Sequence, residues 1–267
     1  MSPALFYNWD IGIRFELGSP YRGIENPEYF NKLIERAVKI FEFVFEENDD
    51  LYVIVSSFEA VEPYKVLNQG ERVFPKYIKN KNDADKVVCI KEEKNFEEEG
   101  YLSSISYQYC LKCKRDDIDY SRIFEVLANR DFCREPYTSD GVYFVNVSKD
   151  IIFHMYDDRG FDVVAKNKEN LQKLYVMLNN WILDYDRKQI DETFKLYNLG
   201  FQRSNSIVKN YNIYAQSRFI FAGDLCTVIK YLRIARIISA IDSNRWLCVT
   251  FFRISFQRCS IEFSSEL

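Results

Sequence analysis

The sequence of 267 residues is 47% hydrophobic and 28% charged, and therefore has enough apolar material for a folded core. This composition excludes a disordered chain, and the net charge of -4 argues against a dedicated nucleic-acid binder. One histidine excludes metal sites that need two imidazoles, and the nine glycines assemble no nucleotide-binding loop, so we expect neither a metal nor a cofactor.

The first third of the chain predicts a strand, a helix and a second strand. Alternating apolar residues over Trp9–Leu17 favour a strand whose other face carries Arg14 and Glu16. Asn26 followed by a proline is typical of a helix start, and Leu51–Val55 has the composition of a buried strand. The predicted helix has one apolar stripe, formed by Phe30, Leu33, Ile34, Ala37, Phe41, Val44 and Phe45.

The middle of the chain shows weaker patterns. Alternation predicts a long strand over Tyr101–Cys113, and Asp117 or Asp119 is expected to cap a helix with apolar positions from Tyr120 to Leu127. For the remaining stretches we expect a short helix around Pro63–Asn68 and exposed charged loops at 80–86 and 92–100.

Three short strands are predicted next, at Val142–Val147, Ile151–Tyr156 and Phe161–Ala165. Their short connections force an antiparallel meander over residues 142–165. A long amphipathic helix follows, capped by Asn167, with Leu171, Leu174, Tyr175, Leu178, Trp181, Ile182 and Tyr185 as its buried stripe. These elements predict an α+β fold, in which amphipathic helices pack on a mostly antiparallel sheet.

A break in charge divides the chain near residue 197. Residues 1–197 carry 27 basic and 36 acidic side chains, whereas residues 198–267 carry nine and four. We therefore predict an α+β domain at 1–197, which folds cooperatively and stays soluble alone, and a basic appendage at 198–267. The appendage is either a separate module or the product of a run-on or shifted reading frame. Within it, Asp224–Ile241 can be drawn as an amphipathic helix that contacts an anionic surface or covers part of the main domain.

The remaining polar candidates favour structural roles. His154 lies in an apolar strand, where a packed side chain is more common than a catalytic base. Cys110 and Cys113 are three apart in a strand and therefore point to opposite faces, which predicts buried thiols rather than a zinc site. The odd number of seven cysteines, and a first segment without signal-peptide features, predict a cytoplasmic location. Charges interrupt the best apolar window, so no membrane span is expected.

Four segments carry a family resemblance: 9–18 (WDIGIRFELG), 129–132 (NRDF), 156–160 (YDDRG) and 181–187 (WILDYDR). They resemble a bacterial family of unknown function marked by a YDDRG signature, whose members are sometimes labelled Rhs-element or Vgr-associated. The resemblance covers about residues 7 to 194 and makes Trp9, Arg14, Glu16, Gly160 and Trp181 structural motif positions. It implies a link to contact-dependent toxin loci, whose small cytoplasmic neighbours are often immunity proteins.

The YDDRG segment is the main candidate site. Tyr156, Asp157, Asp158 and Arg159 fit a type I turn that ends at a left-handed Gly160, and a rigid hairpin tip would display the charges to a partner. Asp184 and Asp186 are expected to extend this patch, although the charges near Arg14 and Glu16 also fit a structural ion-pair network.

Two functions follow from these residues. The first is a non-catalytic binding protein of the immunity type, which sequesters a basic protein partner from a bacterial toxin locus. The alternative is an enzyme of unrecognised class that uses Asp157, Asp158 and Arg159, or His154. Because no catalytic motif accompanies these residues, the sequence favours binding.

Overall fold

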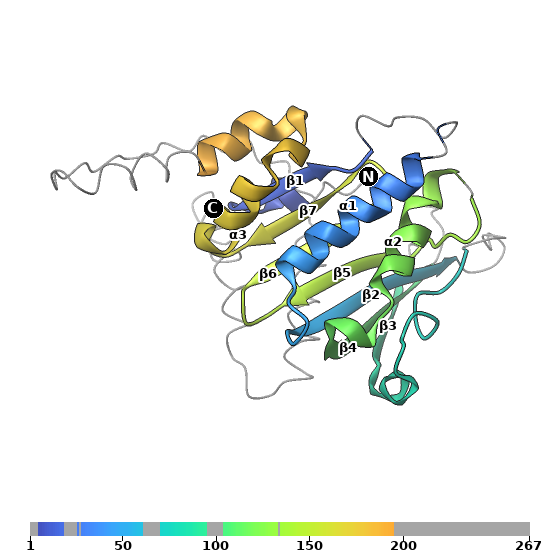
Figure 1. Cartoon of the computed structure of the whole chain (residues 1–267). Coiled ribbons are helices and arrows are strands. Elements are labelled where there is room, and N and C mark those ends of the chain that lie inside the picture. The colour runs from blue at the N-terminus through green and yellow to red at the C-terminus, as the bar shows by residue number, and fades with distance from the viewer. Residues whose placement is uncertain are drawn as a thin grey trace, which may run out of the picture.

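The computed structural model of the protein describes residues 5–18, 26, 28–60, 70–94, 104–132 and 134–194. Within them, seven strands form one antiparallel sheet in the order β1-β7-β6-β5-β2-β4-β3 (Figure 1). The strands are β1 (Gly12–Glu16), β2 (Asp50–Ala60), β3 (Val88–Lys94), β4 (Ser104–Lys114), β5 (Gly141–Asn146), β6 (Ile151–Met155) and β7 (Gly160–Ala165). The α+β class and the meander of β5, β6 and β7 are thus confirmed.

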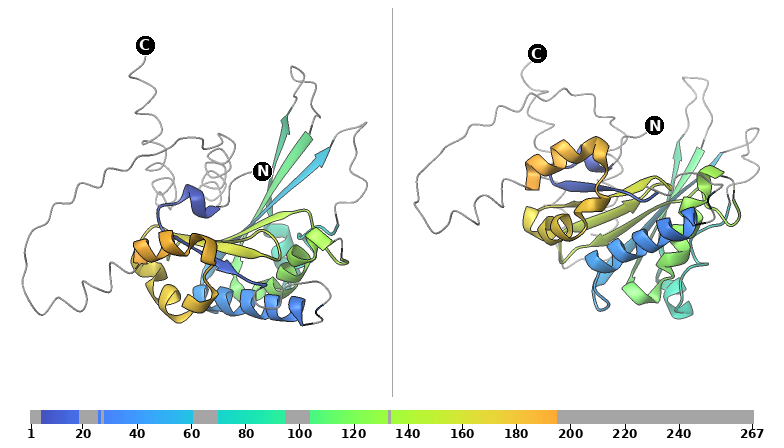
Figure 2. Two further views of the ribbon diagram at one scale, coloured as in Figure 1. Left: turned by 90° about the horizontal axis from the view of Figure 1, so that it is seen from above. Right: turned by 45° about the horizontal axis from the view of Figure 1, so that its top comes forward.

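In the described part of the chain, three α-helices cover one face of the sheet, here called the helix face (Figures 1 and 2). Asp119 caps the second helix by accepting from the amide of Arg122, and Asn26 Oδ1 accepts from the amide of Glu28 at 2.9 Å just before the first. The α-helices are α1 (Tyr29–Val44), α2 (Tyr120–Ala128) and α3 (Lys168–Met177), with a further helical stretch at 187–194. The short 3-10 helices are η1 (Leu5–Asn8), η2 (Lys81–Lys86), η3 (Arg115–Asp117), η4 (Arg130–Phe132), η5 (Asn179–Trp181) and η6 (Asp184–Asp186).

Aromatic rings fill the core between the helices and the sheet. Phe41 of α1, Phe124 of α2, Phe144 of β5 and Phe153 of β6 are fully buried, with centroid distances of 4.9 to 5.9 Å. Burying each such side chain is worth about 1.5–3 kcal/mol. This cluster therefore ties together segments separated by more than a hundred residues.

The opposite side of the sheet, here called the second face, carries its own apolar cluster. Its buried members on the strands are Tyr52, Ile54, Cys110, Val145, Ile152 and Val164. Pairing aligns Tyr52, Val145, Ile152 and Val164 in one row across β2, β5, β6 and β7. η1 lies on this side, against β1 and β7 (Figure 2).

The prediction of one helix from Asn167 to Tyr185 is wrong. α3 ends at Met177, and the chain then runs along β1, where the amide of Leu183 donates to the carbonyl of Arg14 at 2.9 Å. Hydrogen bonds to a strand edge thus replace those of a longer helix. As a result Tyr185, predicted to be buried, is 85% exposed.

Two strand predictions also need correction. Residues 88–94 form β3, paired with β4 along its whole length, although a loop was expected from residue 92. β1 begins at Gly12 rather than Trp9, because the 3-10 helix η1 occupies residues 5–8 just before it. The side chain of Trp9 contacts β7 instead, where its Nε1 donates to the carbonyl of Ala165 at 3.0 Å.

Several predictions fall outside the described residues: the helix at Pro63–Asn68, the boundary at residue 197 and the whole of 198–267 with Asp224–Ile241. The division into two domains therefore remains a prediction. Within the described part of the chain, no helix has the length and apolarity that crossing a membrane requires.

Candidate partner-binding site

The YDDRG turn joins β6 to β7, as predicted, but its carboxylates are not displayed. Asp157 and Asp158 are each only 5% exposed, so the predicted acidic hairpin tip is wrong in this respect. Asp157 Oδ1 accepts from the amide of Arg159 at 2.9 Å, and its Oδ2 accepts from Nε of the same arginine at 2.8 Å. The Arg159 side chain is 75% exposed. The turn therefore exposes the guanidinium of Arg159, and the buried carboxylate of Asp157 balances its charge.

Asp158 points inward and joins the turn to α1. The hydroxyl of Tyr29 donates a hydrogen bond to Asp158, although 129 residues separate the two. Burial raises the pKa of Asp158, and the bond from Tyr29 opposes this shift. The pKa of Tyr29 is raised by burial and then by its bond to Asp158. This pair fixes the turn against the first turn of α1.

Gly160 is required by close approach rather than by a left-handed backbone. Among the described glycines only Gly70 has a positive φ, so the predicted conformation of Gly160 is wrong. Gly160 instead pairs with Glu16 at the edge of β7, where an added Cβ would lie 2.3 Å from the carbonyl oxygen of Phe15. Glycine is needed here because the backbone of β1 occupies the space that a side chain would take.

Arg14 organises the second group of predicted residues. Its Nε lies 3.0 Å from Asp162 Oδ1, its Nη1 lies 2.9 Å from Asp186 Oδ2, and its Nη2 donates to the hydroxyl of Tyr156 at 2.8 Å. Nη1 also donates to the hydroxyl of Tyr7 at 2.8 Å. The Arg14 side chain is only 12% exposed, so Arg14 takes part in the structural ion-pair network that the sequence allowed and not in an exposed charged patch.

Asp162 is the buried anion of this network. It is fully buried and lies across from Arg14 on the neighbouring strand, and it also accepts from the amide of Phe6 at 2.9 Å. Burial raises the pKa of Asp162 to about 6, although Phe6 and Arg14 both favour its charged form. The network binds η1, β1, β7 and η6 into one rigid unit.

The same network presents two exposed residues, Asp184 and Tyr185. Asp186 is 5% exposed and bonded to Arg14, whereas Asp184 is 89% exposed and Tyr185 85%. Nearby Tyr7 is 48% exposed, and its hydroxyl donates to Asp186 Oδ1 at 3.0 Å. Burial raises the pKa of Tyr7. Asp184, Tyr185 and Tyr7 are called the η6 surface below. Sequence reasoning missed Tyr185, because its spacing from Leu178 and Ile182 fits a buried helical stripe.

The other motif residues have structural contacts. The guanidinium of Arg36 lies over the Trp181 ring, 5.4 Å from its centroid, and Arg36 also donates to the carbonyl of Glu16. His154 stacks on Tyr143, with 4.0 Å between ring centroids.

Cys110 and Cys113 are both buried, in the clusters of the second face and of the helix face respectively, as their spacing predicts. Burial raises the pKa of Cys110 to about 12. Burial also raises the pKa of Cys113, so both sites disfavour the thiolate form.

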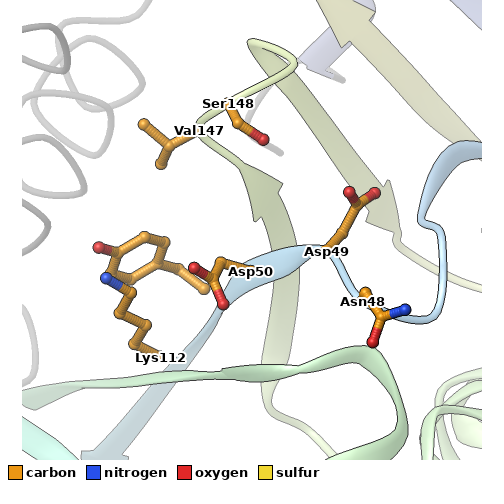
Figure 3. A pocket seen from close by; sticks show the side chains of 7 residues that line it. Asn48, Asp49, Asp50, Lys112, Val147 and Ser148 are labelled. Carbon is orange, nitrogen blue, oxygen red and sulfur yellow. The ribbon is translucent and has the colours of Figure 1, made fainter.

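A pocket of about 200 Å³ lies elsewhere, where β2 begins, β4 ends and β5 turns into β6 (Figure 3). Its polar lining combines Asp50 with Lys112, whose Nζ lies 5.7 Å from the centroid of the Tyr52 ring. Asp49 also lines it, but accepts from Lys149 Nζ at 2.7 Å. None of the predicted site residues lines this pocket, which separates it from the YDDRG turn and the η6 surface.

Comparison of the sequence with known proteins identifies the family of this chain. Residues 1–186 match the family described as "Domain of unknown function (DUF3885)". The chain is 28% identical over 194 residues to the "Uncharacterized protein YnaE" of Bacillus subtilis (strain 168), a match that covers 68% of this chain and 91% of that protein. No solved structure matches. The chain therefore belongs to the DUF3885 family of unknown function.

Proposed function

We propose that this chain is a non-catalytic binding protein that captures a basic protein partner through the η6 surface. One observation carries the proposal: within one turn, Asp186 is buried and bonded to Arg14, while Asp184 and Tyr185 are almost fully exposed. The turn therefore presents an exposed aromatic ring beside a carboxylate.

Such an arrangement suits recognition of another protein. Aromatic anchors contribute most of the energy at many interfaces, and a backbone turn held in place before binding loses little entropy when the complex forms. Arg14 supplies this preorganisation by holding Asp186 and Tyr7 together. The two exposed tyrosines bring both apolar area and hydroxyl groups to a partner.

Charge supports a basic partner. Residues 1–197 carry nine more acidic than basic side chains, and Asp184, which is exposed although its Oδ1 lies 3.0 Å from Arg187 Nε, places one carboxylate beside the anchor. An acidic surface attracts a basic protein over about 10 Å at 0.1 M salt and speeds association. Together with the resemblance to proteins linked to toxin loci, this supports an immunity-type role, in which the partner is a basic effector domain such as a nuclease.

The test uses the full-length chain with an affinity tag, recovered from its own host so that a bound protein can be identified. The purified partner is then bound to the wild-type chain, to Tyr185→Ala and to Phe58→Ala. Phe58 is a matched control, because it is also an exposed ring but lies on β2. We expect Tyr185→Ala to weaken binding by at least about tenfold and Phe58→Ala by less than about twofold. Equal effects, or association rates that do not fall with salt, would refute the proposal.

An enzymatic role remains the alternative, based on carboxylates at the YDDRG turn. Oxygen atoms of Asp131, Asp157 and Asp158 lie within 4.8 Å of one another. These oxygens already have partners, since Arg159 neutralises Asp157 and Tyr29 donates to Asp158. We therefore assign these aspartates a structural role, in which they hold the turn in place. Turnover of a substrate that is lost in Arg159→Ala would favour the alternative.

A further inference from the structure

The η6 surface does not include the YDDRG turn, yet the tyrosine of that turn contacts the residue that organises the surface. Nη2 of Arg14 donates to the hydroxyl of Tyr156 at 2.8 Å, across 142 positions of the sequence. The guanidinium carbon of Arg14 lies 5.6 Å from the centroid of the Tyr156 ring, and Tyr156 is half-buried. One side chain therefore links the turn to the residues beneath the η6 surface.

We propose that Tyr156 is a positioning residue for partner binding. Its hydroxyl fixes the orientation of Arg14, and Arg14 in turn holds Tyr7 and Asp186 in the arrangement that the partner recognises. This inference rests on the proposed function, which assigns partner binding to the η6 surface. The YDDRG turn then acts on binding without contacting the partner, so its tyrosine has a role that its buried aspartates do not share.

The planar guanidinium of Arg14 transmits the effect. Its three nitrogens keep fixed positions relative to one another, so a bond to one of them helps to set where the others point. Nη2 bonds to Tyr156, whereas Nη1 donates to the hydroxyl of Tyr7 at 2.8 Å and lies 2.9 Å from Asp186 Oδ2. Loss of the bond at Nη2 would therefore let Nη1 move relative to Tyr7 and to Asp186, the neighbour of Tyr185.

The remaining contacts of Arg14 do not replace Tyr156. Asp162 lies 3.0 Å from Nε, and a single bond at Nε leaves the guanidinium free to tilt. The Arg14 side chain is only 12% exposed, so water can restore a lost bond only in part. Burial, and then the charge of Asp162, raise the pKa of Tyr156, so its hydroxyl is neutral at pH 7 and can accept from Arg14.

The test compares two tyrosine hydroxyls that bond within or to the same turn. Tyr156→Phe keeps the ring beside Arg14 and removes only the hydroxyl. The matched control is Tyr29→Phe, which removes the hydroxyl that donates to Asp158 from α1. Both changes take one hydrogen bond from the YDDRG turn, but only the first affects Arg14. A loss of stability that is common to both variants is thereby separated from positioning.

Two measurements are made on the full-length chains, at a temperature where circular dichroism shows each variant to be folded. The first is the affinity for the partner captured from the host, with Tyr185→Ala as the variant that removes a direct contact. The second is amide hydrogen exchange at 183–187 and in η1 of the free chains, which needs no partner.

We expect Tyr156→Phe to weaken partner binding about three- to tenfold and to speed exchange at 183–187 by a similar factor. Tyr29→Phe should leave both within about twofold of the wild type. Wild-type behaviour of Tyr156→Phe, or equal changes in the two variants, would overturn the inference. If Tyr185→Ala alone weakens binding, this inference fails and the proposed function stands. If Tyr185→Ala binds like the wild type, the proposed function fails and the positioning role in partner binding fails with it.

Discussion

Gly160 provides the sharpest test of the structure, because a single methyl group separates two explanations. In Gly160→Ala the new Cβ would lie 2.3 Å from the carbonyl oxygen of Phe15. That contact is nearly 1 Å too short, so β1 and β7 must move apart at Glu16 and Gly160. Overpacking of this kind costs about 1–3 kcal/mol. The matched control is Gly141→Ala at the start of β5, where the Cβ would meet nothing closer than 3.9 Å.

Urea unfolding followed by tryptophan fluorescence measures both changes. Gly160→Ala should lower the free energy of unfolding by about 1–3 kcal/mol, whereas Gly141→Ala should be neutral or stabilising by up to about 1 kcal/mol. Gly160→Asn separates the explanations further, because asparagine tolerates a left-handed backbone but is larger than alanine. It should be at least as harmful as Gly160→Ala. Equal effects of the two alanine changes, or rescue by asparagine, would refute the close-approach explanation.

Four further results are expected. Arg14→Lys should lower the free energy of unfolding by roughly 3 kcal/mol in urea titrations, since a lysine cannot replace all the bonds of the buried guanidinium. The raised pKa of Asp162 should make the protein more stable below pH 4 than above pH 6, by about 3 kcal/mol from this group, and Asp162→Asn should remove that slope from the pH dependence of unfolding. Tyr29→Phe should cost about 1–3 kcal/mol, because buried Asp158 loses its donor; an unchanged melting temperature would contradict this. A chain ending at Tyr197 should fold cooperatively by circular dichroism and stay soluble, whereas aggregation of this shorter chain would contradict the predicted boundary.

The sequence predicted those helices and strands that are stabilised by contacts between residues close together in the chain. The stripe of α1 and the cap at Asp119 follow from spacing and from one side-chain hydrogen bond, and short connections fix the meander. The break after Met177 could not be predicted, because the bridge between Ile182 and Phe15 and the hydrogen bond from Leu183 to Arg14 compete with a longer helix. Those bonds join positions far apart in the sequence.

The sequence indicated the charged residues of the candidate site but not their burial. The sequence indicated a turn at 156–160, but two aspartates in a turn normally imply exposure, and the bond from Tyr29 that accompanies the burial of Asp158 spans 129 residues. The pairing of Arg14 with Asp162 and Asp186 likewise depends on strand register. Sequence patterns could therefore identify the charged residues but not which of them reach the surface.

Hydrogen exchange of the full chain, free and bound to its captured partner, tests the central claim most directly. If the η6 surface binds the partner, amides at 183–187 and in η1 should exchange at least about tenfold more slowly in the complex, while those of the turn at 156–159 stay unchanged. Slower exchange at 156–159, with no change at Asp184, Tyr185 and Asp186, would contradict the account and return the YDDRG turn to the interface.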